Sequence, residues 1–400
     1  MRIFVLGEEF PFPMNTGARI RNFALLSRLA KNHEMRFLAY GEENSEAFRF
    51  CDEAGLNPIA VPSQVPPKSG PGFYLRLLVN LFSGLPYVVT SHYSGVYRDR
   101  FRAELAKWPA DLLAAAWTPY AAYFNDVPRM KTLITSHNIE ADIWNRYYQT
   151  EESFHKKWYA GIQAAKMERF EKTAFGRADA VTAVSEADAE AVKRSGSRAA
   201  VKVIDNGVDL AYFTNEHPPQ IKANRLVFTG SMDWRPNQDA AEFFVNDIFP
   251  RLRRTRPELE AVFVGRQPPE HILRLGEIPG ITITGTVDDI RPYIREAAVY
   301  IVPLRVGGGS RLKILEALAL EKAIVSTSVG AESLAVTHQK DILLADTPEE
   351  FAAAVESLLD NGQLAAQLGA AGREMVVRRY GWDRLAEDLD KFLVELVEAK

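Results

Sequence analysis

A strand, a glycine loop and a helix are indicated by the stretch Val302-Pro-Leu-Arg-Val-Gly-Gly-Gly-Ser-Arg-Leu-Lys-Ile-Leu-Glu316. It continues an apolar, β-branched run over residues 299–304, which is typical of a buried strand that Pro303 helps to end. Ser310 is predicted to cap the apolar helix that follows the three glycines. A strand, a glycine loop and a helix N-terminus together present backbone N–H groups and a positive dipole end, which favour a phosphate group.

The same stretch has a simpler interpretation as a connecting turn, in which Lys313 and Glu316 form a surface ion pair. Three consecutive glycines are costly to order, and this cost favours close approach of the backbone to a ligand. Arg311 and Lys313 add positive charge, but on an ideal helix they lie about 200° apart. Both reach one ligand only if Arg311 still belongs to the turn.

The composition excludes several classes of protein. The 400 residues suffice for two ordinary domains, and 47% hydrophobic with 25% charged residues is typical of a soluble globular chain. A net charge of −4 gives no support to a nucleic-acid-binding protein. Cys51 is the single cysteine, the first residues predict a strand and no signal peptide, and no apolar stretch approaches the roughly 20 residues of a membrane span. We therefore expect a cytoplasmic protein.

Strands alternate with helices along the chain, which predicts parallel sheets covered by helices. The expected strands of the first half are 2–7, 36–40, 58–62, 111–116, 132–136, 180–184 and 201–205. Those of the second half are 226–230, 260–264, 281–284, 299–302 and 323–326. Turn and proline signals between residues 206 and 222 predict a domain boundary there. We assign domains to residues 1–206 and 207–380, with a last helix over 381–400 that packs back on the first domain.

Residues 71–86 are aromatic and leucine-rich, with Arg76 as the one charged side chain. This composition predicts a buried helix. The alternative is a surface helix that contacts lipid, which requires an open, basic face around Arg76.

Two further segments lie at the ends of predicted strands, where ligands of open α/β sheets bind. His137 follows the strand at 132–136, and its alternative role is to cap the next helix together with Asn138 and Glu140. Gly17 and Arg19 follow the first strand, and their alternative is an ordinary turn with a surface charge.

The order and spacing of seven motifs resemble glycosyltransferase family 4, whose members have the GT-B fold of two Rossmann-like domains facing each other across a cleft. The motifs are Thr16-Gly-Ala-Arg-Ile-Arg21, His137-Asn-Ile-Glu140, Val203-Ile-Asp-Asn-Gly-Val-Asp209, Gly230-Ser-Met-Asp-Trp-Arg-Pro-Asn237, Thr284-Gly-Thr-Val-Asp-Asp-Ile290, the glycine loop with its helix, and Val329-Gly-Ala-Glu332.

The resemblance implies roles for single residues. The second domain is expected to bind a nucleotide-diphosphate sugar and the first domain its acceptor. Gly307, Gly308, Gly309 and Ser310 would lie against the diphosphate, which Arg311 or Lys313 would neutralise. Glu316 would bind the ribose hydroxyls, Val287 would lie beside the base, and His137 would face the transferred sugar, with Glu140 as a weaker candidate on the acceptor side.

The chain departs from the family pattern at two places. Many members carry two glutamates eight positions apart, but Gly308 stands eight positions before Glu316, so the first acid is missing. Backbone N–H groups of the glycine loop are expected to replace it, as in a subgroup with a similar Gly-Gly-Gly-Ser/Thr-Arg-Leu-Lys signature. Many members also place an Arg and a Lys after the first strand of the second domain, whereas only Arg235 is available here.

The resemblance implies a retaining glycosyltransferase, and the cations of the second domain lead us to expect that it works without a metal or another cofactor. Arg311, Lys313, Arg235 and a helix N-terminus can stabilise the charge that grows on the leaving diphosphate. Asp288-Asp289 is interpreted as a helix cap, because no cluster has metal-ligand spacing. We expect a role in cell-surface or exopolysaccharide synthesis, on a glycan or lipid-linked acceptor. The alternatives are a nucleotide-sugar 2-epimerase of similar fold and a non-catalytic protein that binds nucleotide sugars.

Overall fold

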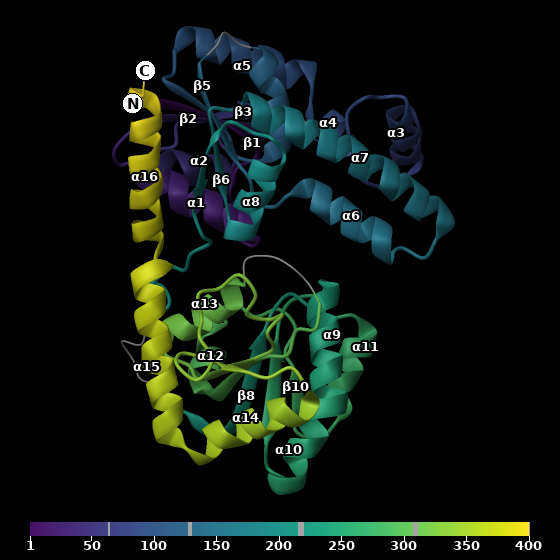
Figure 1. Cartoon of the computed structure of the whole chain (residues 1–400), viewed down its shortest axis with the longest axis vertical. Coiled ribbons are helices and arrows are strands. Elements are labelled where there is room, and N and C mark those ends of the chain that lie inside the picture. Colours follow the sequence, from purple (N-terminus) through teal and green to yellow (C-terminus); the bar gives the residue numbers. More distant parts are fainter. Residues whose placement is uncertain (63–64, 127–129, 215–219, 307–310, 400) are drawn as a thin grey trace. The chain divides into compact units, whose positions relative to one another are not determined.

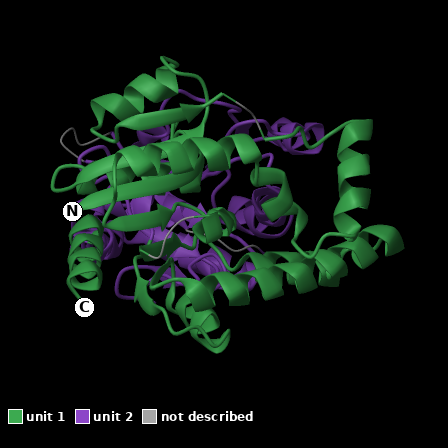
Figure 2. Ribbon diagram, turned by 90° about the horizontal axis from the view of Figure 1, so that it is seen from above, with its two compact units in different colours: residues 1–205, 385–400 green, residues 206–384 purple. Residues whose placement is uncertain are grey.

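The computed structural model describes residues 1–62, 65–126, 130–214, 220–306 and 311–399. The chain divides into two compact units, residues 1–205 with 385–400 and residues 206–384, which Figure 2 colours separately. Each unit contains one parallel sheet covered by helices, so the predicted α/β class with two Rossmann-like domains is confirmed.

The first unit is built on a seven-stranded parallel sheet with the order β3-β2-β1-β4-β5-β6-β7. Its strands are β1 Arg2–Glu9, β2 Glu34–Tyr40, β3 Pro58–Val61, β4 Leu112–Ala115, β5 Lys131–Thr135, β6 Ala180–Ala183 and β7 Ala200–Val203. Its helices are α1 Gly17–Leu29, α2 Glu46–Glu53, α3 Pro71–Leu81, α4 Tyr87–His92, α5 Gly95–Lys107, a 3-10 segment Thr118–Asp126, α6 Glu140–Thr150, α7 Phe154–Arg177 and α8 Glu186–Arg194.

β1 shows why this sheet forms. Its residues Ile3 to Leu6 are all buried, as expected for a central strand covered on both faces. Phe4 and Leu6 share a core with Tyr97 and Phe101 of α5. Because side chains alternate along a strand, Ile3 and Val5 point to the opposite face. They line a small cavity there with leucines of α1 and with Leu389 and Leu393.

The second unit repeats the design with a six-stranded parallel sheet of order β10-β9-β8-β11-β12-β13. Its strands are β8 Lys222–Thr229, β9 Glu260–Val264, β10 Ile281–Ile283, β11 Ala297–Val302, β12 Ile324–Ser326 and β13 Leu343–Leu344. Its helices are α9 Arg235–Phe243, a π-helical segment Phe244–Ile248, α10 Phe249–Thr255, α11 Glu270–Leu273, a 3-10 segment Arg274–Glu277, α12 Arg291–Glu296, α13 Leu312–Ala319, α14 Pro348–Asp360 and α15 Gly362–Arg379.

The last helix, α16 Trp382–Glu398, belongs to the first unit from Leu385 onward. Besides the apolar contacts of its leucines, Asp390 accepts hydrogen bonds from Asn32 (2.9 Å) and His33 (2.5 Å). Among the helices in the described ranges, none is long and apolar enough to cross a bilayer.

The prediction of a buried helix at residues 71–86 was wrong. α3 forms, but Asn80 is its one buried residue. Tyr74, Leu75, Leu78, Val79 and Phe82 are between 56% and 90% exposed and share one face by helical spacing. Arg76 turns toward the protein, where it donates to the carbonyl of Pro67 and to the hydroxyl of Tyr87. The exposed face is therefore apolar, and Arg76 does not make it basic.

The prediction that Ser310 is the N-cap of α13 also needs correction. The helix begins at Leu312 with Arg311 in the N-cap position, whose φ of 49° and ψ of 28° are left-handed. Arg311 therefore belongs to the turn, which is the condition under which it shares a ligand with Lys313. Gly307, Gly308, Gly309 and Ser310 lie outside the described residues.

Candidate functional site

Both sheets reverse their strand order at corresponding places. In the first unit the chain runs outward from β1 through β2 to β3 and returns to β4 on the other side of β1. In the second it runs from β8 through β9 to β10 and returns to β11 beside β8. Ligands of open α/β sheets bind outside the carboxyl ends of the strands at such a reversal. The two reversals are therefore the places at which site residues are expected.

At the second reversal, Lys313 is fixed by neutral groups. Its Nζ donates to Oδ1 of Asn237 over 2.7 Å and lies 4.0 Å from the centre of the Phe228 ring. Asn237 is buried and is itself oriented by a hydrogen bond to the carbonyl of Ser231. Within the described ranges no carboxylate forms an ion pair with Lys313. Burial, reinforced by the positive charge of Arg311, lowers the pKa of Lys313 to about 7.

Gly230 makes room for this ammonium group. A Cβ atom at Gly230 would lie 2.7 Å from Nζ of Lys313 and 2.8 Å from Nδ2 of Asn237. Both atoms are ends of flexible side chains, so a larger residue would push them aside. The position of the Lys313 charge thus depends on the absence of a side chain at residue 230.

Arg311 adds a second cation at the start of α13. Its side chain is buried, and Nη2 lies 3.4 Å from Oε2 of the exposed Glu332. Burial lowers the pKa of Arg311, although the Glu332 carboxylate partly offsets the effect. Lys313 and Arg311 thus place two partly desolvated cations next to each other at a helix N-terminus, which favours an anionic ligand.

Glu316 lies one turn after Lys313 and is half-buried. Burial raises the pKa of Glu316 to about 7, and the positive charge of Lys313 opposes the shift. No donor in the described part of the chain forms a hydrogen bond with its carboxylate. The predicted alternative of a surface ion pair between Lys313 and Glu316 is wrong, because neither side chain is exposed and no ion pair joins them.

The other predicted residues of the second unit are more scattered. Arg235 is the first residue of α9 and is exposed. Asn237, two residues later, is the side chain that accepts the hydrogen bond from Lys313. Val287 is half-buried after the edge strand β10 and packs on the core. Asp289 accepts a hydrogen bond from the backbone N–H of Arg291 (2.9 Å) and pairs with its guanidinium group, so it stabilises the start of α12.

In the first unit, His137 follows β5, the strand next to β4, and is half-buried. Its Nε2 lies 2.8 Å from the carbonyl oxygen of Ala116, which can only accept. Nε2 therefore carries the proton, and Nδ1 of the neutral ring is an acceptor. Burial, reinforced by the charge of the buried Arg21, lowers the pKa of His137 to about 4. His137 is thus neutral near pH 7 and offers one hydrogen-bond acceptor.

The cap of α6 does not come from His137, Asn138 or Glu140. The backbone N–H groups of Glu140 and Ala141 donate instead to the carboxylate of Glu171, a buried residue of α7. The Glu140 side chain accepts a hydrogen bond from Nε1 of Trp117 over 2.8 Å, and burial raises its pKa. Glu140 is thus oriented by Trp117 and remains a candidate for ligand contact.

Gly17 is the first residue of α1, which Thr16 caps. Arg19 makes two hydrogen bonds to the Glu9 carboxylate, of 2.6 and 2.5 Å. Gly17 and Arg19 thus fit the predicted alternative of an ordinary turn with a paired surface charge.

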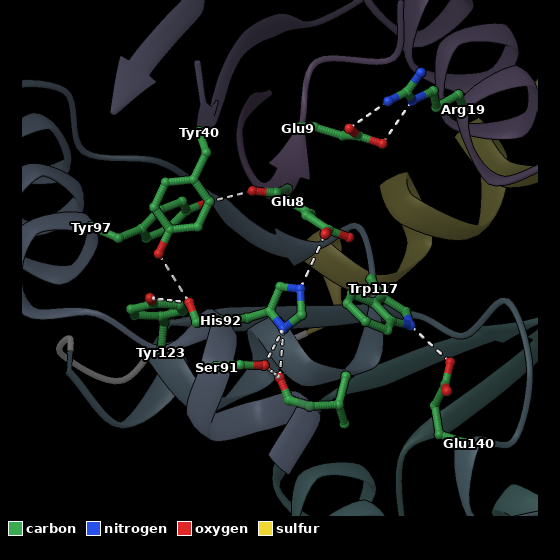
Figure 3. A network of polar contacts seen from close by, with 12 residues as sticks. Glu8, Glu9, Arg19, Tyr40, Ser91, His92, Tyr97, Trp117, Tyr123 and Glu140 are labelled. Atoms are coloured by element: carbon green, nitrogen blue, oxygen red, sulfur yellow. Dashed lines mark hydrogen bonds and ion pairs between the residues drawn. The ribbon is translucent and has the colours of Figure 1, made fainter. Parts of the chain in front are cut away.

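A polar pair that no motif of the sequence predicted lies at the same end of the sheet. Glu8, near the end of β1, lies 3.1 Å from Nε2 of the buried His92 (Figure 3). The signal available in the sequence was the acidic pair Glu8-Glu9 at the end of the first strand. Its partner is 84 positions away, which no local pattern indicates.

No cluster of three or more His, Cys, Asp or Glu residues in the described ranges is arranged to hold a metal ion.

Comparison with known protein families gives two matches. A family described as Glycosyltransferase Family 4 matches residues 16–212, and one described as Glycosyl transferases group 1 matches residues 223–361. The two matches are separated by residues 213–222 and follow the order of the two units.

Among curated proteins, the chain is similar to a GDP-mannose-dependent alpha-(1-6)-phosphatidylinositol monomannoside mannosyltransferase of Mycobacterium tuberculosis. The two are 32% identical over 197 residues, which are 46% of this chain and 49% of the relative. The match thus spans about half the length of that relative. The chain is also similar to an uncharacterized 44.6 kDa protein in the cps region of Klebsiella pneumoniae. The two sequences are 20% identical over a match that covers 88% of this chain and 89% of that protein.

Two solved structures share the whole fold. Sucrose-phosphate synthase from Thermosynechococcus elongatus superposes with a TM-score of 0.72 at 17% identity, covering 100% of both chains. Anabaena HepE in complex with UDP superposes with a TM-score of 0.66 at 15% identity, covering 99% of this chain and 100% of its own. At sequence identities of 17% and 15%, these superpositions establish the fold alone.

Proposed function

This chain belongs to the group 1 glycosyltransferases of family 4, and we propose that it transfers a sugar from a nucleotide-diphosphate sugar to a hydroxyl group of a glycan or lipid-linked acceptor. Transfer proceeds with retention at the sugar carbon and without a metal ion. The expected setting is cell-surface or exopolysaccharide synthesis in the cytoplasm, at the inner face of the membrane.

The observation that carries this proposal is the cation Lys313, held at a sheet reversal by an amide oxygen and an aromatic ring. Breaking a glycosyl phosphate bond leaves negative charge on the diphosphate, and fixed cations stabilise that charge. A bound diphosphate would also restore the full charge of Lys313, whose pKa burial lowers to about 7. Lys313 and Arg311 therefore act on the leaving group, with Arg235 and the backbone of residues 307–310 as further donors.

The remaining residues are assigned to different parts of the donor. Glu316 accepts hydrogen bonds from the ribose hydroxyls, and Val287 packs beside the base. Val287 follows β10, which lies three strands from β11, or about 14 Å at the usual strand spacing. This separation suits the two ends of a nucleotide diphosphate. His137 positions the transferred sugar by accepting a hydrogen bond at Nδ1.

A nucleotide-sugar panel tests the proposal. GDP-mannose and UDP-glucose come first, because relatives or structural neighbours are named with these donors. A ligand at 100 times its Kd stabilises the folded state by about 2.7 kcal/mol, which is a shift of several degrees in Tm. The absence of a shift with every donor would sink the proposal. A shift without transfer identifies a binding protein, and release of an epimerised nucleotide sugar identifies an epimerase.

Retention and metal independence need separate measurements. The anomeric proton of the product, observed by NMR from the first turnovers, is expected to have the configuration of the donor. Activity is expected to survive EDTA. Inverted product or a loss of activity that Mg²⁺ or Mn²⁺ restores would contradict these two parts.

A lipid-linked acceptor would be reached through the apolar face of α3. Tyr74, Leu75, Leu78, Val79 and Phe82 leave a row of apolar side chains in water, and such faces mark interaction sites. Because Arg76 is turned inward, contact with a bilayer would rest on apolar insertion and depend little on salt. In Figure 1, α3 stands away from the sheet of its own unit, so this face is not covered by it.

Vesicle flotation tests the contact. The wild-type protein is expected to float with phosphatidylcholine vesicles at 0.15 M and at 0.5 M salt, and Phe82→Ser with Leu78→Ser is expected to remain in solution. Val96→Ser is the control, since Val96 is an exposed apolar residue of α5. Flotation that requires anionic lipid, or that the double variant retains, would contradict the apolar contact.

A further inference from the structure

The reversal in the first sheet carries two residues that none of the seven family-like motifs includes. Glu8 lies near the carboxyl end of β1, and Trp117 follows β4, the strand on the other side of the reversal. Figure 3 shows both side chains around the imidazole ring of His92. The rings of His92 and Trp117 meet edge to face with centroids 5.1 Å apart. A ligand in the usual place for this kind of sheet would meet these side chains.

His92 fixes the orientation of Glu8. The ring is 2% exposed, and its Nδ1 lies 2.6 Å from the carbonyl oxygen of Val88. That oxygen can only accept, so Nδ1 carries a proton. The hydroxyl of Ser91 is 3.2 Å from the same nitrogen. Nε2 then faces Oε1 of Glu8 at 3.1 Å, within hydrogen-bonding distance.

The surroundings favour a charged Glu8. Burial alone would raise the pKa of Glu8, but the hydrogen bond and the positive charge of His92, with Lys68 and Arg19 nearby, lower it below its usual value. The carboxylate therefore remains a strong hydrogen-bond acceptor near pH 7.

One oxygen of Glu8 is left for another molecule. Oε1 is bound to His92, whereas Oε2 receives no hydrogen bond from any residue in the described ranges, and the side chain is 36% exposed. A carboxylate oxygen held in a fixed direction beside an indole ring suits a ligand with hydroxyl groups on an apolar carbon frame. A carbohydrate or another cyclic polyol has this chemistry.

We propose that Glu8 binds a hydroxyl group of the sugar or polyol acceptor through Oε2, and that His92 is the residue that positions it. The assignment rests on the proposed function, because it supplies the acceptor side of that reaction. It involves no covalent step.

The neighbouring Glu9 provides a matched control. It is one residue away on the same strand, but Figure 3 shows its carboxylate turned to Arg19, which occupies both of its oxygens. Glu8 and Glu9 thus differ in partner while sharing charge, size and strand. A general effect of removing negative charge from this edge would appear in both variants.

The experiment compares Glu8→Gln, His92→Gln and Glu9→Gln with the wild-type protein. Glutamine keeps an oxygen for Nε2 of His92 but replaces the other acceptor by an NH₂ donor. The wild-type protein and each variant are assayed with methyl α-D-mannopyranoside and with myo-inositol as acceptors, using the nucleotide sugar that the panel identifies. Transfer to water without an acceptor and the Tm are measured in parallel.

Glu8→Gln is expected to raise the acceptor KM about tenfold, the loss typical of a hydrogen bond to a charged group. The donor Kd and transfer to water should not change. His92→Gln should raise the acceptor KM less, since the carboxylate remains but is no longer fixed. Glu9→Gln should leave the acceptor KM unchanged.

Two results overturn the assignment separately from the proposed function. If the wild-type protein transfers sugar and Glu8→Gln leaves the acceptor KM unchanged, or lowers the Tm and transfer to water in parallel, Glu8 is a structural residue. If the wild-type protein binds no nucleotide sugar, the proposed function fails and the assignment fails with it.

Discussion

The two sheet reversals of this chain have the same topology and opposite chemistry. At β8 and β11, the nearby side chains are two cations, an amide and a carboxyl group whose pKa is raised by burial: Arg311, Lys313, Asn237 and Glu316. At β1 and β4, they are Glu8, His92 and Glu140, two carboxyl groups and an imidazole. The strand order determines where a ligand can bind in each unit, and the side chains at the strand ends determine which ligand it is. The cationic reversal suits a diphosphate, and the acidic one suits hydroxyl groups.

The largest effect on ligand binding is expected from removing the Lys313 cation at the second reversal. Lys313→Met should weaken nucleotide-sugar binding about 10- to 100-fold, because a hydrogen bond to a charged group contributes about 1.5–3 kcal/mol. Thermal stability should be kept, since the ammonium group is desolvated without a carboxylate partner in the described residues. Titration calorimetry measures the Kd. The exposed Lys340→Met is the control, and equal losses in both variants would mean that Lys313 has no specific role.

The pH dependence of donor binding also tests the role of the Lys313 charge. Since the pKa of Lys313 is about 7 in the free protein, Lys313 is charged below that pH and a bound diphosphate finds it protonated. Above pH 7, binding must take up a proton, so affinity should fall about tenfold per pH unit. Glu316, whose pKa burial raises to about 7, ionises over the same range, so the contribution of residue 313 to the slope has to be separated by a variant. A nucleotide sugar is the ligand of choice because its diphosphate does not titrate there.

Lys313→Arg tests the cause of that slope. An arginine stays charged throughout, so the part of the slope that comes from residue 313 should vanish. An unchanged slope would assign the proton uptake to another group.

A variant of His137 tests the site residues of the first unit. His137→Ala should lower kcat about tenfold and leave the donor Kd unchanged, because a neutral ring whose pKa is about 4 contributes a hydrogen bond and little acid–base catalysis. A loss of about a thousandfold would indicate general-base catalysis instead. Unchanged kcat would remove His137 from the site.

The smallest effect is expected at Glu316. Glu316→Gln should weaken donor binding about fivefold, which is the contribution of one ordinary hydrogen bond. The difference between variant and wild-type protein should disappear with a 2′,3′-dideoxynucleoside diphosphate, which lacks the ribose hydroxyls. A difference that persists with this ligand would place Glu316 elsewhere in the site.

The sequence allowed much of the fold to be predicted, because apolar runs bounded by turn residues are local signals. All strands expected between residues 2 and 326 form. β13 was missed because its two residues, Leu343 and Leu344, carry no periodicity. The left-handed Arg311 was missed because non-glycine residues rarely adopt this conformation, so Ser310 was predicted as the N-cap in place of Arg311.

The candidate site was predictable where residues adjoin a motif and hidden where partners are distant. Lys313 and Glu316 follow the glycine stretch directly, whereas their surroundings depend on Asn237 and Phe228 from other elements. Glu171 caps α6 from another helix. The exposure of α3 was also hidden, because apolar composition is the same for a core helix and for a helix that contacts a partner.

The close contacts at Gly230 limit the substitutions that residue 230 can tolerate. Because a Cβ there would displace the ends of Lys313 and Asn237, Gly230→Ala should fold normally and yet lose donor binding. In a saturation scan selected for transferase activity, residue 230 should tolerate as few replacements as residue 313. Residue 230 would then be constrained by the space that the Lys313 ammonium group and the Asn237 amide need.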